Sequence, residues 1–342
     1  MSAKNAMKIG FACKWVDLND AVVQATSFKK TTVRWCNEHP LEVRAKLEGL
    51  VEQNCCALDE LIRQVSLLEP ARRMCRLTSD ILPLFTHELG QRHLYKSPGV
   101  LNYIQTRLAA AGAAARAANI RLSFHPGQFT VLNTDKLELL QNSMAEVEMH
   151  TQLAGWLGAT EWHQNGFCIN IHGGGRAGGL ENLKVAISNL SQEAQNLLTI
   201  ENDEFSWGTA DLVAANLKVP IVLDVHHHWI NTGTHLLPDS ELWSRVQDGW
   251  RGSRPKIHCA MSDAELLVGY EDRLPVLSEL LATKKTKSKL RAHSQSAHHL
   301  PTIDYFLRFL PTADLMWEGK SKNADQQIIY QRAVEMGFLT PA

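Results

Sequence analysis

The sequence has no excess of charge of either sign. Lysine and arginine together number 35, against 36 aspartate and glutamate residues, which gives a formal net charge of −1. The electrostatic field of the whole chain therefore gives no indication of a nucleic-acid partner. Any basic surface that binds an acidic partner must be local.

The sequence also lacks paired cysteines and long apolar runs. Its seven cysteines include no CxxC pair, which excludes a regular disulfide framework and indicates reduced thiols, as in cytosolic proteins. No stretch is apolar enough to span a bilayer, and the opening MSAKNAMKIGFAC has no signal-peptide layout. We therefore expect a cytoplasmic protein without a membrane partner.

Internal repeats and linkers rich in proline, glycine or serine are missing as well, so nothing divides the 342 residues into domains. Short runs rich in β-branched residues recur instead, and few of them alternate cleanly, as expected for parallel strands covered on both faces. The runs occupy residues 8–13, 74–79, 120–125, 167–172, 197–202, 220–226, 255–261 and 314–320.

Helix candidates lie between these runs, at residues 100–120, at 136–157 and directly after Asp239. Eight strands that alternate with helices over this length predict an α/β fold, a single (β/α)8 TIM barrel spanning residues 1–342. A doubly wound open sheet is the alternative. The basic and polar segment 284–299 is expected to be irregular.

Nearly every predicted strand ends at a residue that can bind a metal ion. A lone histidine at a strand end is usually structural, but the joint pattern is hard to reconcile with random scatter of fifteen histidines. Mixed imidazole and carboxylate ligands suit Mn, Zn or Fe(II) better than a closed structural zinc site. The candidate ligands are His87, His125, His172, Glu201, Asp224, His227, His258, His293 and Glu318.

So many ligands exceed what one ion can use, which predicts two or three divalent ions at the C-terminal face of the strands. Glu201, on the middle strand, is the candidate bridging carboxylate. Asp224 and His227 are three residues apart across a strand end, so both can turn toward one ion. His226 and His228, their neighbours on the expected turn, are predicted to point away.

The glycine-rich GGGRAG at residues 173–178 follows a strand and fits the GxGxxG pattern of dinucleotide-binding folds. His172 precedes it, and the rest of the chain offers metal ligands instead. We therefore expect no nucleotide cofactor, although a close approach of this backbone to a phosphate is compatible with the pattern.

Seven short motifs resemble the UV damage endonuclease family, in order and through almost the whole chain. The stretches that carry the resemblance are FHPGQF (124–129), INIHGGG (169–175), TIEND (199–203), LDVHHHWIN (223–231), KIHCAMS (256–262), RAHS (291–294) and MWEGK (316–320). The family is similar in fold to endonuclease IV, a TIM barrel with a multi-metal site. The resemblance thus implies the same barrel and the same nine ligands.

The resemblance also implies an activity. It is an ATP-independent nick immediately 5′ to a UV photoproduct, a cyclobutane pyrimidine dimer or a 6-4 product, in double-stranded DNA. The products are a 3′-hydroxyl and a 5′-phosphate, and Mn²⁺ is the expected ion, with Zn²⁺ or Mg²⁺ as alternatives. We expect a monomer in which Glu201, Lys256 and His258 act in catalysis.

Lesion binding in the family implies contacts from Phe11, Gln128 and Phe129, with tyrosine more usual at the two aromatic positions. Lys256, two residues before His258 and facing the same side of its strand, is interpreted as a phosphate-binding or charge-balancing ammonium. A carboxylated lysine that bridges metals is the alternative. Segments 16–39 and 284–290 align least with the family.

Two other functions compete with a nuclease. A sugar isomerase with two metals would explain histidine and glutamate at strand ends, but not the HPGQF motif or the basic segment. A non-catalytic binder of damaged DNA would have no reason to keep nine ligands.

Overall fold

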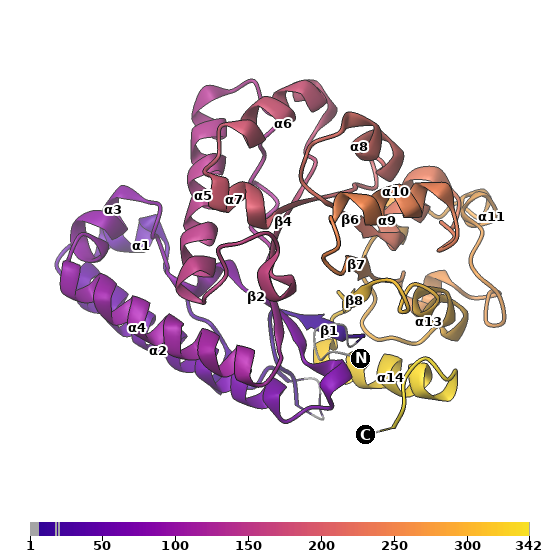
Figure 1. Cartoon of the computed structure of the whole chain (residues 1–342), viewed down its shortest axis with the longest axis horizontal. Helices are drawn as coiled ribbons and strands as arrows, with labels where there is room; N and C mark the ends of the chain where they lie inside the picture. The colour runs from indigo at the N-terminus through magenta and orange to yellow at the C-terminus, as the bar shows by residue number, and fades with distance from the viewer. Residues whose placement is uncertain (1–6, 18, 20, 342) are drawn as a thin grey trace.

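Eight parallel strands close into a barrel in the computed structural model, which describes residues 7–17, 19 and 21–341 (Figure 1). Each strand pairs with the next along the chain, and β8 pairs with β1. The strands are β1 (Ile9–Ala12), β2 (Met74–Leu77), β3 (Arg121–Phe124), β4 (Cys168–His172), β5 (Leu198–Glu201), β6 (Ile221–Asp224), β7 (Lys256–Cys259) and β8 (Asp314–Trp317). The predicted TIM barrel is confirmed, and the open sheet is excluded.

The helices surround this barrel and include the three that the sequence predicts, as α4, α5 and α10. Two of these helices begin with common N-terminal signals. Pro98 occupies the first turn of α4, and the Ser240 side chain caps α10 by accepting from the Trp243 amide. The α-helices are α1 (Val33–Glu38), α2 (Val43–Ser66), α3 (Glu88–Gly90), α4 (Pro98–Ala117), α5 (Leu137–Trp156), α6 (Gly179–Ser188), α7 (Gln192–Leu197), α8 (Thr209–Ala215), α9 (Val225–Thr232), α10 (Glu241–Gly249), α11 (Leu277–Ala282), α12 (Lys287–Leu290), α13 (Leu300–Leu307) and α14 (Lys322–Glu335).

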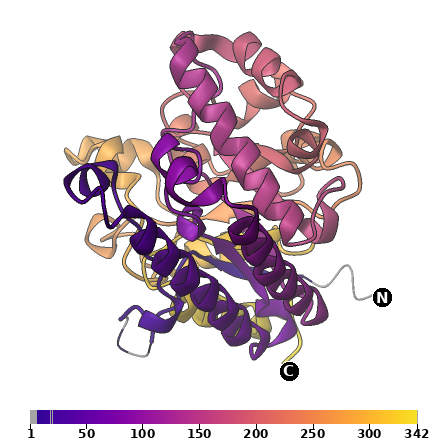
Figure 2. The same cartoon turned by 90° about the vertical axis from the view of Figure 1, so that its left-hand side faces the viewer.

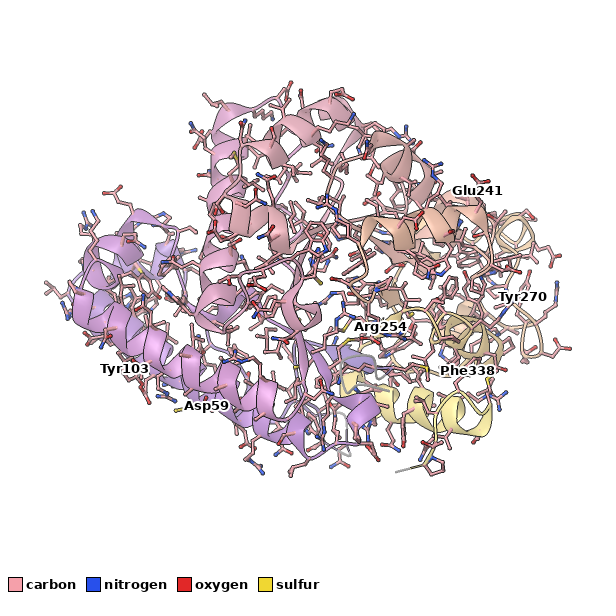
Figure 3. All side chains as sticks on the ribbon, in the orientation of Figure 1. Asp59, Tyr103, Glu241, Arg254, Tyr270 and Phe338 are labelled. Atoms are coloured by element: carbon pink, nitrogen blue, oxygen red, sulfur yellow. The ribbon has the colours of Figure 1, made fainter. Side chains whose placement is uncertain are left out.

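The apolar core lies between the strands and the helices. Phe11 and Phe124, from β1 and β3, point outward into one large cluster with Leu47 and Leu58 of α2. The long helices α2 and α4 lie side by side over this cluster (Figures 1 and 2). Their outer faces are joined by Arg107, which donates to Asp59 at 2.8 Å, on the flank where Asp59 and Tyr103 are labelled in Figure 3.

The inside of the barrel carries many polar groups, because charged, amide and hydroxyl side chains such as Arg121, Asn170 and Thr199 alternate with the outward apolar residues. Asn170 and Thr199 hydrogen bond to each other there, at 2.9 Å. At the floor, the carboxylate of Asp314 accepts from Arg121 at 2.8 Å and from Arg254 at 2.6 Å. An ionic layer thus seals the barrel at the N-terminal ends of the strands.

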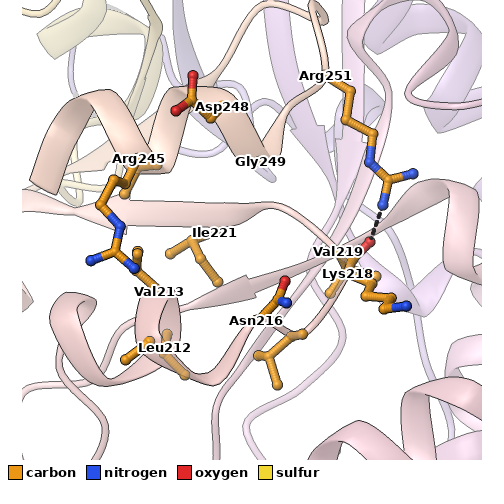
Figure 4. Close-up of a pocket in the computed structure, with 13 residues that line it drawn as sticks. Leu212, Val213, Asn216, Lys218, Val219, Ile221, Arg245, Asp248, Gly249 and Arg251 are labelled. Carbon is orange, nitrogen blue, oxygen red and sulfur yellow. Dashed lines mark hydrogen bonds between the residues drawn. The ribbon is translucent and has the colours of Figure 1, made fainter.

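A cavity of about 480 Å³ lies between α8 and α10, beside the start of β6 (Figure 4). Its lining includes Asn216, Arg245 and Asp248, and Arg251 donates to the carbonyl of Lys218 at 2.8 Å. None of the predicted site residues lines it. The cavity therefore lies at the N-terminal end of β6, whereas Asp224 stands at its C-terminal end.

Helices long and apolar enough to cross a membrane are absent from the described part of the chain. The expected lack of a signal-peptide layout rests partly on residues 1–6, which lie outside the described residues. The poorly aligned segment 16–39 carries a short bridge between Val16 and Val22 and the helix α1, and it contains residues 18 and 20, which are also outside.

Candidate metal centre

The C-terminal ends of the strands bring most of the candidate ligands together. His172 and Glu201 are register partners on β4 and β5, and Asp224 and His258 are partners on β6 and β7. His125 follows β3 directly. Because neighbouring parallel strands lie only about 4.8 Å apart, register partners at strand ends place their side chains within reach of one ion.

Glu201 stands at the middle of the site and is fully buried. Its Oε2 lies 3.0 Å from Nδ1 of His258 and 3.3 Å from Nε2 of His125, and its Oε1 lies 3.4 Å from Nδ1 of His227. Two groups of possible ligands, each with its ligand atoms within 4.8 Å of one another, share this residue. The groups are His125, His172 and Glu201, and Glu201, Asp224, His258 and Glu318. Such sharing is the arrangement that a bridging carboxylate requires.

Several buried atoms of these residues make no hydrogen bond of regular geometry with the residues that the structure describes. They include Oε1 of Glu201, Oδ2 of Asp224, Nδ1 of His172 and both ring nitrogens of His258. Buried polar groups in native proteins are nearly always satisfied, and a buried carboxylate without a partner is costly. Divalent cations would satisfy these atoms, so the donor set fits a metal centre.

The pKa values show how much negative charge is packed into the site. Burial, together with Glu201 and Glu318, raises the pKa of Asp224 to about 8 against the opposing effect of His227. Burial would lower the pKa of His227, but Asp224 and Glu201 outweigh it and raise the pKa to about 9. The shifts reflect the burial of several carboxylates close to one another and to histidines, an arrangement that a bound cation would stabilise.

His227 and His293 lie beside the two ligand groups rather than within them. Nε2 of His227 is 3.8 Å from Oε2 of Glu204, and the ring of His293 lies 6.3 Å from that of His227. His226 and His228 point elsewhere, as predicted, toward the carbonyl of Leu290 and the hydroxyl of Thr209.

His87 does not join either ligand group in the described structure. Its exposed ring N-caps α3, with Nδ1 accepting from the Leu89 amide at 3.1 Å. The residue lies ten positions beyond Leu77, where β2 ends, so strand geometry does not fix its position. The predicted role of His87 as a ligand gains no support from this geometry.

Lys256 is 1% exposed and lies deeper in the barrel than His258. Its Nζ makes no hydrogen bond with any residue that the structure describes, and burial lowers its pKa, with Arg121 and Arg76 acting in the same direction. An ammonium below the surface does not reach a DNA strand. The predicted direct contact between Lys256 and DNA gains no support from this burial.

Phe11 is a similar case. Its side chain is fully buried and faces α2, between Gly10 and Ala12, which face the barrel interior. Its ring packs edge-on against Trp15 at 5.7 Å. Phe11 therefore packs as a core residue, and its predicted contact with a lesion gains no support from this geometry.

Gln128 and Phe129 are both exposed beyond the end of β3, and 80% of the Phe129 surface is accessible. The chain turns away from His125 through Pro126 and Gly127, which frees the two side chains from the core. They line a cavity of about 700 Å³ that also reaches four of the candidate ligands. These four are His172, His227, His293 and Glu318. One hollow thus joins the exposed aromatic ring to the candidate metal centre.

Three supporting residues escaped the sequence analysis. Asn170 donates to Oε2 of Glu201, Arg76 pairs with Glu318, and Asn202 holds the backbone of Asp224 through two hydrogen bonds of 2.8 and 3.0 Å. Asn170 and Arg76 could have been found, because each faces the barrel interior near a strand end, two residues before the end of β4 and one residue before the end of β2. Asn202 follows Glu201 and carries no such signal.

The glycines of residues 173–178 serve close packing between two loops at the rim. A Cβ at Gly178 would overlap the carbonyl oxygen of Asn133, and Gly174 has a φ of +74°. The Asn133 side chain also donates to the carbonyl of Gly175 at 2.5 Å. This packing explains the glycine pattern without a dinucleotide.

The fold and the ligand set define a TIM barrel with a candidate multi-metal centre at the C-terminal face of its strands. The model of the family described as UV-endonuclease UvdE matches residues 7–332. The chain belongs to this family, which confirms the resemblance seen in the motifs.

Curated relatives carry the same name. The chain is 33% identical over 201 residues to the UV-damage endonuclease of Neurospora crassa, covering 54% of this chain and 30% of that protein. It is 28% identical over 262 residues to the UV-damage endonuclease of Schizosaccharomyces pombe, covering 72% of this chain and 38% of that protein. It is 26% identical over 279 residues to a UV DNA damage endonuclease of Bacillus cereus, covering 77% and 76% of the two chains. The chain thus spans well under half of the fungal relatives.

Two solved structures share the fold. The crystal structure of SacUVDE has a TM-score of 0.73 at 20% identity and covers 97% of this chain and 100% of that one. Endonuclease IV from Thermus thermophilus has a TM-score of 0.51 at 13% identity, with 82% and 94% covered.

Proposed function

We propose that the protein is a DNA-repair endonuclease that nicks one strand immediately 5′ to UV photoproducts, namely cyclobutane pyrimidine dimers and 6-4 products. The reaction is metal-dependent phosphodiester hydrolysis that leaves a 3′-hydroxyl and a 5′-phosphate. The observation that carries the proposal is the cavity that joins an exposed aromatic ring, Phe129, to the buried carboxylates around Glu201.

Two or three divalent ions, with Mn²⁺ expected, would be held by Glu201 and its neighbours. These neighbours are His125, His172, Asp224, His227, His258, His293 and Glu318. Bound ions of this kind supply a water of lowered pKa, a Lewis acid and a clamp on the reacting oxygens. The ligand set thus fits phosphodiester chemistry.

The protein's own residues orient this site. Asn170 fixes one oxygen of Glu201, and Arg76 fixes one oxygen of Glu318, so both carboxylates keep a defined direction. Residues that support metal ligands in this way typically matter about 10- to 100-fold for affinity or activity. Lys256, which is buried beneath His258, would balance negative charge from below the site, and a carboxylated Lys256 that helps to hold the ions is the alternative.

Gln128 and Phe129 are proposed to act on the lesion. An enzyme that works on a base inside a duplex must extrude it, and extrusion is easiest where stacking is already weakened. The Phe129 ring can fill the space that extruded bases leave, and the Gln128 amide offers both a donor and an acceptor to the orphaned partner bases. We further propose one domain that acts as a monomer on double-stranded DNA without a nucleotide cofactor.

Nicking of supercoiled plasmid tests the proposal. Irradiated plasmid should be converted to open circles and plain plasmid should not, a chelator should abolish conversion, and elemental analysis should find at least two transition-metal ions per chain. Glu201→Gln should lower nicking by at least about 100-fold with little change in folding. Glu181→Gln, at an 82% exposed position of α6, is the matched control.

The two alternative functions predict other results. A non-catalytic binder would retain irradiated plasmid without nicking it, and a sugar isomerase would ignore both plasmids. Full activity of Glu201→Gln would remove Glu201 from the site. A duplex with one photoproduct, labelled at its 5′ end, would map the position and the ends of the nick.

A further inference from the structure

The loop after β5, residues 202–208, is held rigidly at the rim of the cavity. The Asp203 carboxylate accepts from the amides of Phe205 at 2.7 Å and Ser206 at 2.8 Å, and the Asn231 side chain donates to the Asp203 carbonyl at 3.0 Å. The Asp203 amide donates to the carbonyl of Trp207 at 2.9 Å. A loop closed on itself in this way presents its side chains in a fixed direction.

Phe205 stands at the tip of this loop and is 52% exposed. Its chain neighbours Glu204 and Ser206 line the same cavity as Gln128 and Phe129. The ring belongs to none of the apolar clusters of the described residues. Phe129, on the loop after β3, thus lines the cavity, and Phe205, on the loop after β5, lies beside its lining residues.

Arg291 completes this feature from the segment before β8. Its guanidinium carbon lies 5.3 Å from the centre of the Phe205 ring, and its Nη1 donates to Oε1 of Glu204, which is 6% exposed. Glu204 therefore fixes the guanidinium plane and neutralises its charge. A neutralised cation is a weak ligand for phosphate, but its plane still extends the flat surface of the ring.

We propose that Phe205 and Arg291 form a second stacking wall that takes an unstacked base of the substrate, with Glu204 as the residue that positions Arg291. The inference rests on the proposed function and deepens it, because extruded bases exist only if the protein opens a duplex. Stacking on an aromatic ring tolerates any base, as a nick at different photoproducts requires. The cavity of about 700 Å³ lies within the range of roughly 300–1,000 Å³ that suits small ligands.

The proposed stacking wall can be tested by measuring binding to DNA duplexes that cannot be nicked. These duplexes carry a methylphosphonate at the scissile linkage. Phe205→Ala and Phe205→Leu in the metal-loaded protein should weaken affinity for a photoproduct duplex by about 5- to 150-fold, the usual effect of losing one base–aromatic stack. Phe205→Trp should retain affinity, and undamaged duplex should bind all variants equally. Val185→Ala, at a 59% exposed position of α6, is the control for loss of an exposed apolar side chain.

A second duplex, with abasic sites opposite the photoproduct, identifies the stacked base. If Phe205 holds a partner base, the effect of Phe205→Ala disappears on this duplex; if it holds the photoproduct, the effect persists. Glu204→Gln should weaken photoproduct binding and, by freeing the Arg291 charge, steepen the salt dependence on undamaged duplex by about one phosphate contact.

Parent-like affinity of Phe205→Ala, or of Phe205→Leu, would overturn the wall, as would an equal loss on undamaged duplex. Failure of the proposed function is distinct from this result. In that case the parent protein itself would not prefer the photoproduct duplex, whatever residue stands at position 205.

Discussion

Phe129, whose ring is 80% exposed, lies only four positions beyond His125, whose Nε2 is 3.3 Å from Glu201. The turn at Pro126 and Gly127 converts this short separation in sequence into two different environments. One side chain ends in the candidate metal centre, and the other projects into solvent at the rim. The two positions therefore allow recognition and chemistry to be tested separately.

The double variant Gln128→Ala, Phe129→Ala should keep its metal content, and its free energy of unfolding should change by no more than about 0.5 kcal/mol, because both side chains are exposed. It should lose nicking at photoproducts. His125→Ala should instead lose bound metal. Elemental analysis, thermal melting and the nicking assay separate these outcomes, and normal nicking by the double variant would place recognition elsewhere.

The residue types at strand ends could be predicted because strand periodicity fixes where they point. Glu201, Asp224 and His258 are all brought together as the sequence predicts. Residues outside the strands are less predictable, since loop geometry alone places them, and His87 is the clearest case. Phe11 differs, because its expected role came from the family resemblance, whereas the alternation along β1 indicates an outward-facing core residue.

At the scale of elements, the three consecutive histidines form part of a helix rather than the expected turn. The Asp224 carboxylate accepts from the amide of His227 at 2.7 Å and so caps α9, and Gly233, with a φ of +79°, ends it. An aspartate before the helix and a glycine after it are the usual signals of helix boundaries. Helical rotation then explains why only His227 among the three faces Glu201.

The basic segment before β8 is more ordered than its composition indicates, since Lys287–Leu290 form α12 with Thr286 as its cap. Lys285 and Lys287 donate to the carbonyls of Leu266 and Asn231, at 2.8 and 3.3 Å. The remaining lysines, Lys284 and Lys289, are exposed, and their ammonium groups have no partner in the described part of the chain. These two are the cations of the segment that are left for DNA phosphates.

Neutralisation of Lys284 and Lys289 to glutamine should therefore weaken binding to damaged and undamaged duplex alike. The slope of log affinity against log salt should fall by about 0.9 for each lysine that contacts a phosphate. Lys218→Gln, an exposed lysine near the start of β6, is the control at the opposite end of the barrel. An unchanged slope in the double variant would show that the segment does not contact DNA.

At the scale of the whole molecule, buried histidines make the fold sensitive to acid. His150 of α5 is fully buried, with Nδ1 on the Glu146 carbonyl at 2.7 Å and Nε2 on the Ser79 hydroxyl at 2.9 Å. Burial lowers its pKa to about 4. Because the unfolded chain then binds a proton more readily than the folded chain, stability falls as the pH falls below about 6.5 and is unaffected above it.

The free energy of unfolding should thus fall by about 3 kcal/mol between pH 6.5 and pH 4 because of His150 alone. Urea unfolding of the chelator-treated protein across this range measures the effect without a contribution from metal release. His150→Gln keeps a hydrogen-bonding side chain but removes the titration, so its stability should depend less steeply on pH. An identical pH dependence in the two proteins would assign the acid sensitivity to other groups.

Closure of the barrel also determines when the candidate metal centre can form during protein synthesis. β8 pairs with β1 on one side and β7 on the other, and Glu318, at its end, completes the second ligand group. A nascent chain that has not yet delivered residues 314–318 can neither close its sheet nor assemble that group. A fragment that ends before residue 314 should therefore lack the second ligand group and, under the proposed function, should leave irradiated DNA uncut.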